Sequence, residues 1–184
     1  ANNGTYSASI DTRVCTVDVA TRAITLGTGY SFGIAPSGNN SILQCIDAVN
    51  LEGNNWLLYL SIKLTTGTKE MKVLACQIDT TARTITYGTI YSVVSGAVYS
   101  GSLLKCSTTS GIAFYGTSYM YFTVNFATNV VTFPNTAQSS PVSGTLIKWL
   151  ESKKVDNTGV VATRNASSYA VISKYAVTDG VIAL

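Results

Sequence analysis

Histidine is absent from the 184-residue sequence, and charged residues are scarce. Without an imidazole the chain lacks the commonest general base and the commonest metal ligand, which excludes Ser–His and Cys–His catalytic arrangements. Charged residues make up 11% of the chain, less than half of the roughly 25% that is typical of globular proteins. The surface must therefore be covered mainly by Ser, Thr, Asn and Tyr, which suits contact with other proteins or with sugars.

Long apolar runs are also missing, since no stretch reaches the roughly 18 residues that a membrane-spanning helix needs. A hydrophobic content of 46% predicts a folded core. The net charge of +3 is scattered, and its densest basic point, Lys153-Lys154, is more typical of a solvated loop than of a nucleic-acid-binding patch. The N-terminus shows no signal-peptide pattern, and the chain starts at Ala1, so either an initiator methionine was removed or the chain is part of a longer one. The length predicts one domain, residues 1–184.

Internal repetition is the strongest signal in the sequence. Nine of the eighteen residues in segment 15–32 recur, without a gap, in segment 76–93. The same offset of 61 positions aligns residues 42–45 with residues 103–106. Weaker third and fourth copies place the marker position of the repeat at residues 25, 86, 132 and near 183. The spacings of 61, 46 and 51 residues are close to the roughly 40–50 residues of a propeller blade.

Each copy has the pattern of a β-hairpin. Asp18 and Asp79 supply turn chemistry after an alternation of polar and apolar residues. A second strand of β-branched and aromatic residues follows, and Gly27 and Gly88 would end or kink it. We therefore predict an all-β fold of repeated antiparallel hairpins in four-stranded, propeller-like sheets, with about 3.5 repeats that oligomerisation could complete. The repeats run roughly over residues 8–32, 41–93, 101–135 and 142–184.

Further strand-like runs lie between these hairpins, punctuated by Gly, Ser and Asn. They cover residues 41–49, 56–64, 70–78, 102–108, 118–126 and 168–177. Segment 145–154 is ambiguous, because its apolar residues fit either a short helix or a buried strand. We predict a strand there, since the segment stands where the first strand of a repeat belongs.

The sequence Thr-Ile-Thr-Tyr-Gly-Thr at residues 84–89 completes a pattern that resembles the β-propeller-like repeats of tailed-phage virion proteins. Tail fibres and other appendages carry such runs, often written Thr-Ile-Thr-x-Gly-Thr. The resemblance covers residues 8 to about 135 and concerns a structural hairpin, so it bears more on fold than on chemistry.

This resemblance implies a non-enzymatic structural subunit of a virion, assembled in the host cytoplasm as part of a tail fibre or similar appendage. The implied partners are other virion proteins and the chain itself, as a trimer or another homo-oligomer, with a host-surface glycan as a further partner. Nucleic-acid binding and membrane insertion are not expected. A capsid decoration (cement) protein and a lectin-like carbohydrate-binding module stay open as alternatives, with a polysaccharide-degrading enzyme last.

No catalytic residue, metal site or cofactor is predicted. Ser102 and Lys105 fit the Ser-x-x-Lys pattern of certain acyl-transfer enzymes, but they lie in a strand-like run and the partner motifs are absent. Two of the nine acidic residues could converge as in a glycosidase. A structural role is the stronger interpretation, because Asp18 and Asp79 occupy equivalent hairpin turns. No Asp-x-Asp-x-Asp loop points to calcium.

The four cysteines, Cys15, Cys45, Cys76 and Cys106, lie 30, 31 and 30 residues apart. This spacing does not fit a zinc site, whose cysteines normally lie about two to four residues apart. Their recurrence at repeat-equivalent positions predicts small buried core residues instead of disulfides, in keeping with a reducing cytoplasm.

Aromatic residues are the best candidates for ligand contacts, because a tyrosine or tryptophan offers an apolar face with a polar tip. The chain has eleven tyrosines and two tryptophans. We single out Tyr115, Tyr119, Tyr121 and Trp56 as candidate binding residues. The alternative is that these rings only cover the half-buried side of a sheet.

Overall fold

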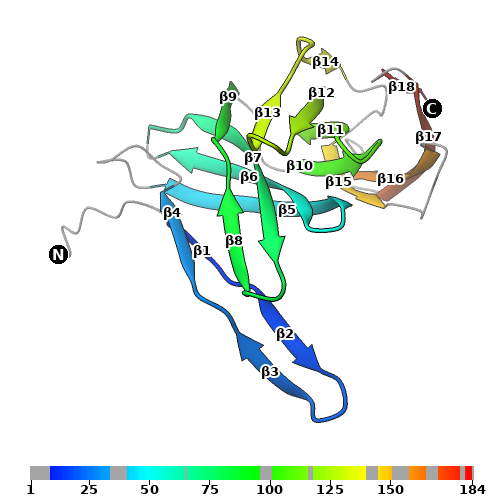
Figure 1. Cartoon of the computed structure of the whole chain (residues 1–184). Helices are drawn as coiled ribbons and strands as arrows, with labels where there is room; N and C mark the ends of the chain where they lie inside the picture. The colour runs from blue at the N-terminus through cyan, green and yellow to red at the C-terminus, as the bar shows by residue number, and fades with distance from the viewer. Residues whose placement is uncertain are drawn as a thin grey trace.

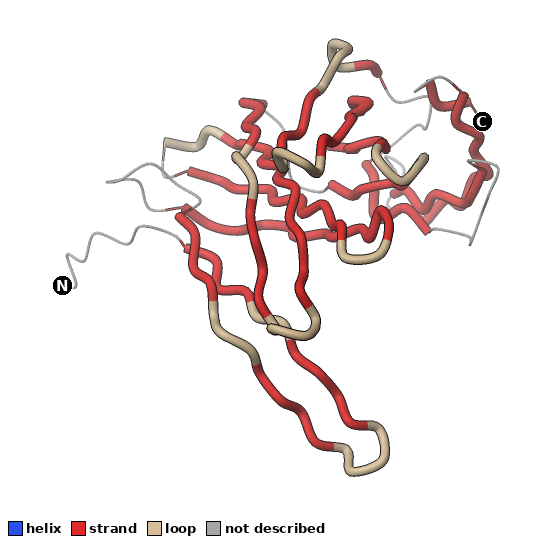
Figure 2. The backbone as a smooth tube through the Cα atoms, viewed as in Figure 1, coloured by secondary structure: helices blue, strands red, loops and turns tan. Residues whose placement is uncertain are grey.

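A computed structural model describes residues 9–33, 41–64, 66–95, 101–115, 118–139, 145–150, 158–164, 170–178 and 181–183. Every regular element in these segments is a β-strand (Figures 1 and 2). The strands are β1 (Ser9–Thr12), β2 (Cys15–Asp18), β3 (Ala23–Leu26), β4 (Tyr30–Gly33), β5 (Ser41–Glu52), β6 (Asn55–Leu64), β7 (Lys69–Asp79), β8 (Thr84–Tyr87), β9 (Tyr91–Ser95), β10 (Gly101–Lys105), β11 (Ser110–Tyr115), β12 (Ser118–Asn125), β13 (Val130–Thr132), β14 (Gln138–Ser139), β15 (Thr145–Leu150), β16 (Thr158–Arg164), β17 (Ala170–Thr178) and β18 (Val181–Ala183).

The strands form two two-stranded antiparallel sheets, β1-β4 and β2-β3, which we together call the half-sheet, and three larger antiparallel sheets. In the half-sheet, β1 pairs only with β4 and β2 only with β3 among the described strands. The second sheet has the order β5-β6-β7-β8, with β9 also paired to β7. The third has the order β10-β11-β12-β13, with β14 on β12, and the fourth has the order β15-β16-β17-β18. The predicted fold class, all-β with repeated antiparallel sheets, is confirmed.

The second sheet is apolar on both faces because it is covered on both sides. One face packs against the third sheet in a cluster that includes Leu57, Tyr59 and Met71 from the second sheet and Ala113 and Phe122 from the third. The opposite face carries a smaller buried cluster, which consists of Leu60, Ile62, Leu64 and Leu74. Figure 1 shows this sheet at the centre of the molecule, between the half-sheet and the later sheets.

A partly buried carboxylate also links the second and third sheets. The carboxylate of Asp47 on β5 accepts hydrogen bonds from the hydroxyl of Ser102 (2.7 Å) and from the backbone N–H of Leu103 (2.9 Å). Ser102, the serine of the Ser-x-x-Lys pattern, is thus engaged in holding two sheets together.

The structure bears out most of the strands that the sequence predicts. Each of the six runs between the hairpins coincides with a strand, and the ambiguous segment contains β15 (Thr145–Leu150). Strands β11 and β16 were not predicted, and neither was the two-residue strand β14. The turn of the fourth hairpin and Lys153-Lys154 lie outside the described residues. In the described segments, no helix has the length and apolar character needed to cross a membrane.

Candidate functional site

The half-sheet is equivalent to the last two strands of the repeat that forms the second sheet. In the half-sheet Thr12 pairs with Tyr30 and Val17 with Ile24. Adding 61 to each number gives pairs of the second sheet, Val73 with Tyr91 and Ile78 with Ile85. The register of every pair in the half-sheet is repeated in this way. In the second sheet, however, β7 is also paired along its other edge to β6, and β1–β2 has no such neighbour among the described strands.

Three successive hairpins close with the same turn. In the first, a carboxylate oxygen of Asp18 accepts hydrogen bonds from the backbone N–H groups of Ala20 (2.9 Å) and Thr21 (3.2 Å). Asp79 accepts the equivalent pair in the second hairpin, both at 2.8 Å. In the third, the side-chain oxygen of Asn125 takes the same place and accepts from a backbone N–H at 3.0 Å. These side chains satisfy backbone donors that the tight turn leaves without a partner.

The last residue of each turn has a left-handed backbone. The φ angle is 57° at Arg22, 54° at Arg83 and 53° at Asn129. Hydrogen bonds from the side chain and backbone of Thr21, and from a further backbone N–H, hold the pKa of Asp18 below its usual value. The predicted role of Asp18 and Asp79 as turn residues of the repeat therefore has a direct hydrogen-bonding basis.

The hairpins stack on one another through the two repeat glycines. Gly27 of the first hairpin lies against the turn of the second, so that a Cβ at this position would be 2.6 Å from the Cβ of Arg83. Gly88 of the second hairpin lies in the same way against the turn of the third, where a Cβ would be 2.7 Å from the Cβ of Asn129. Each turn thus packs against the base of the preceding hairpin, and that preceding hairpin extends beyond the turn. Figure 2 shows β2–β3 as the hairpin that projects furthest.

We call the β2–β3 hairpin, residues 15–26, the arm. Paired residues share a face of a sheet, so Cys15 with Leu26 and Val17 with Ile24 form one wholly apolar face of the arm. This face is open to solvent: Val17 is 58% exposed, Ile24 65% and Leu26 58%. At the tip, Val19 is 86% exposed. A two-stranded hairpin with an uncovered apolar face is marginally stable by itself in water.

The equivalent faces of the later hairpins are covered. In the second hairpin Ile78 and Ile85 are half-buried, and in the third Val124 and Val131 are each only 5% exposed. The third hairpin is covered by the second sheet, because Val124 and Val131 belong to the same buried cluster as apolar residues of that sheet. The second hairpin is covered in part by the half-sheet, where the ring of Tyr30 lies 4.7 Å from the ring of Tyr87 between centroids. Of the three hairpins whose side chains the structure describes, only the arm lacks a covering sheet.

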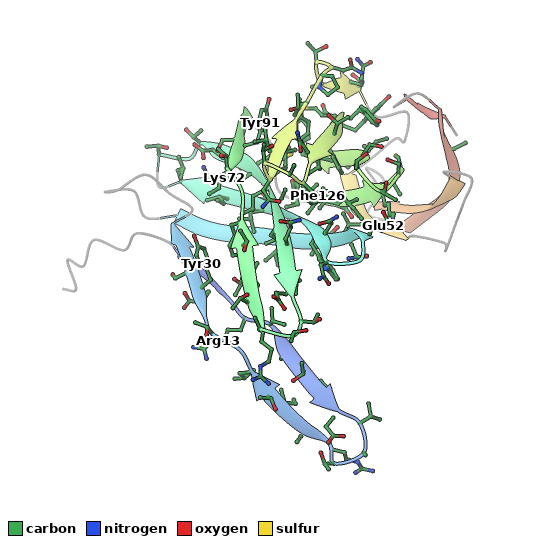
Figure 3. The ribbon with its side chains drawn as sticks, in the orientation of Figure 1. Arg13, Tyr30, Glu52, Lys72, Tyr91 and Phe126 are labelled. Carbon is green, nitrogen blue, oxygen red and sulfur yellow. The ribbon has the colours of Figure 1, made fainter. Side chains whose placement is uncertain are left out.

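A cavity of about 350 Å³ lies where the arm leaves the body of the molecule. Arg13, which Figure 3 shows at this junction, lines it together with residues of the second sheet. Its lining combines apolar, aromatic and polar groups and includes Arg13, Val14, Asn54, Trp56, Ile78 and Ile85.

The candidate binding tyrosines are placed differently from one another. Tyr115 and Tyr119 are buried, at 6% and 3% exposure, and burial raises the pKa of the Tyr115 hydroxyl. Rings in the interior do not offer a face to an external ligand. Tyr121 and Trp56 are half-buried, and of the four candidates only Trp56 lines the cavity.

The cysteines do not all behave as small core residues. Cys76 is 2% exposed, and burial raises the pKa of its thiol to about 12. Cys106 is half-buried, and the side chain of Cys45 lies outside the described residues. The prediction of burial is wrong for Cys15, which is exposed. The reason is that its hairpin lacks the covering sheet that buries the equivalent position of the next repeat. Cys15 and Cys76 are free thiols.

No cluster suited to metal binding was found: in the described part of the chain, His, Cys, Asp and Glu do not come together in groups of three or more. The sequence pointed to the arm only as a repeat motif. It gave no signal that the apolar face of that motif would be uncovered. Comparisons with protein-family models, with characterised proteins and with solved structures give no match.

Proposed function

We propose that the chain is a non-enzymatic structural subunit of a virus particle, of the kind built into the tail fibre or another appendage of a tailed phage. Its role is to associate with copies of itself and with neighbouring particle proteins. The observation that carries this proposal is the arm, an apolar hairpin that projects from a stack of rigid sheets without a covering layer. An exposed apolar surface of this kind typically marks a site of protein association.

The rest of the architecture supports the same role. The repeats stack sheet on sheet, with glycines at the contacts that allow close backbone approach. Such stacks are rigid, and an incomplete unit at one end is where association extends a stack. The low charge of the sequence, 11%, is compatible with broad contact surfaces. The resemblance of residues 84–89 to phage appendage repeats is the reason for proposing that the subunit belongs to a virion.

The mass and shape of the purified chain test this proposal. Light scattering gives the mass in solution, and negative-stain imaging gives the shape. A stable oligomer, elongated or ring-shaped, is the expected result for an appendage subunit. A capsid decoration protein is distinguished by binding to empty capsids, which an appendage subunit does not do. A compact monomer at all concentrations would contradict assembly.

The cavity at the base of the arm favours a second candidate, a lectin-like module. Trp56 supplies an aromatic surface there, and Arg13 and Asn54 supply hydrogen-bond donors, a combination that suits a sugar. Binding on a glycan array, with sugar-dependent quenching of tryptophan fluorescence, is the expected result. The quenching should be lost in Trp56→Phe and kept in Trp149→Phe. Quenching that survives Trp56→Phe would exclude this cavity as the site.

A further inference from the structure

The uncovered face of the arm is the most prominent apolar feature of the described surface. Among the described residues, seven large hydrophobic side chains are strongly exposed, and four of them belong to the arm and its tip. The other three, Tyr30, Ile46 and Val130, lie on β4, β5 and β13 and do not form a comparable face. The described surface therefore offers one apolar sheet face and no second one to complement it.

The repeats of this chain show what kind of structure covers such a face. In the third hairpin the face is buried by another sheet of the same chain, and in the second it is partly buried by the half-sheet. What fits on the arm is thus a sheet of the same repeat. With no other apolar sheet face on the described surface, the arm of a second copy is the complementary one.

The chemistry of the face suits contact with itself. Cys15, Val17, Ile24 and Leu26 carry no charge, so two such faces can meet without burying an unpaired ion. The polar side of the arm, with Thr16, faces the opposite way. A twofold contact requires a self-complementary patch of this kind. From their exposed fractions, complete burial of these apolar side chains in two arms would remove roughly 700–800 Å², and the flanking polar residues and Val19 at the tip supply the rest of the ~1,000 Å² that a specific interface needs.

We infer that the arms of two copies pack face to face about a twofold axis, so that each arm becomes the covering sheet that the other lacks. This inference rests on the proposed function and makes it specific. Assembly then proceeds through pairs, and the arm is the element that joins them. The packing is that of two small sheets in a sandwich, with the apolar side chains of the two arms interdigitated.

Cys15 reports on this contact because its thiol lies on the apolar face and is exposed in the single chain. The full chain is treated with iodoacetamide at about pH 8, where the thiolate is the reacting form, over a range of protein concentrations. The alkylation rate of each cysteine is followed by mass spectrometry, and light scattering gives the mass under the same conditions. Half-buried Cys106 is the internal control.

The expected result is the mass of two copies, or of another even number of copies. Alkylation of Cys15 should slow by about fivefold once the total chain concentration exceeds the dissociation constant by tenfold, because only the free chain reacts and about one fifth of the chains are then free. The rate at Cys106 should not depend on concentration. Ile24→Lys places a charge on the apolar face and should abolish both the pairing and the protection of Cys15. Thr25→Lys, on the opposite face of the same strand, should leave both unchanged.

Two results would overturn the inference while leaving the proposed assembly function intact. One is an oligomer in which Cys15 reacts as fast as in dilute solution, which would assign the arm to a different partner. The other is an odd-numbered oligomer such as a trimer, which a twofold contact cannot build by itself. A monomer at every concentration would contradict both the inference and the proposed function.

Discussion

Replacing Gly88 with alanine should destabilise the stack of hairpins, because its Cα lies directly against the backbone of the next turn. A Cβ at this position would lie 2.7 Å from both the carbonyl carbon and the Cβ of Asn129, closer than real Cβ atoms approach other atoms. The turn cannot easily move away. Asn129 is only 9% exposed, has a φ of 53° and donates a hydrogen bond from its side chain to Gln77.

The size of the effect follows from the cost of overpacking. Adding a methyl group to a well-packed site typically costs about 1–3 kcal/mol. We expect about 2–3 kcal/mol for Gly88→Ala, because the obstacle is backbone and not the end of a flexible side chain. For a chain of this size each kcal/mol lowers the midpoint of thermal unfolding by about 2–4 °C. The expected decrease is therefore about 4–12 °C.

Thermal unfolding followed by circular dichroism, at one fixed protein concentration, measures this decrease. Gly29→Ala is the matched control, because a Cβ at Gly29 would meet only the guanidinium end of Arg13, 3.0 Å from Nε, which can swing aside. We expect Gly29→Ala to change the stability by less than about 0.5 kcal/mol. If Gly88→Ala unfolds within about 1 °C of the wild type, the stacking of turn on glycine does not hold the hairpins together.

Three further predictions concern the turns and the thiols. Asp79→Ala should lower the free energy of unfolding by about 1–2 kcal/mol, because two backbone N–H groups lose their acceptor. Urea denaturation measures the free energy of unfolding. Asp79→Asn keeps an acceptor oxygen and should retain most of the stability that Asp79→Ala loses. The carboxyl group of Asp18 should titrate below its ordinary pKa in an NMR titration, because Thr21 hydrogen-bonds to the charged form. Since the pKa of Asp18 is lower in the folded state than in the unfolded state, the carboxylate stabilises the fold at pH values above the unfolded-state pKa. This stabilisation is lost as the pH falls through the folded-state pKa. An ordinary or raised pKa for Asp18 would contradict the turn geometry. Burial raises the pKa of the Cys76 thiol to about 12, so Cys76 should stay unmodified by iodoacetamide at about pH 8 while Cys15 reacts. Mass spectrometry measures both rates in dilute protein, and equal rates would show that Cys76 is not buried.

Much of the fold could be predicted because hairpin chemistry is local. The aspartates of the first two turns bond to backbone groups two and three residues further on, so a short stretch of sequence contains the whole turn. The repeated spacing then places equivalent hairpins in successive sheets. The strands missed, β11 and β16, lack a clear alternation of polar and apolar residues. All six residues of β11 are buried, so its side chains give no sign of which face points to the core.

The candidate site could be predicted only in part. The sequence predicts a structural role for the residues of the repeat motif, and in the structure Asp18 bonds to the backbone of its turn and Gly27 packs against the next turn. The binding role proposed for tyrosines could not be judged from their number, because Tyr115 and Tyr119 lie inside the molecule. Their burial depends on strands that are far apart in the sequence, and composition does not record which side of a sheet is covered.

By itself, the sequence determined the all-β class, the repeated hairpins and the turns that close them, because each depends on neighbours within a few residues. Only the tertiary structure decided which copies of the repeat are covered. Cys15 and Cys76 occupy equivalent positions in two copies of the same motif, yet one is exposed and the other buried. Burial is a property of what packs against a residue from elsewhere in the chain. In the described part of the chain no sheet packs against the apolar face of β2–β3, and for that reason the arm is left open.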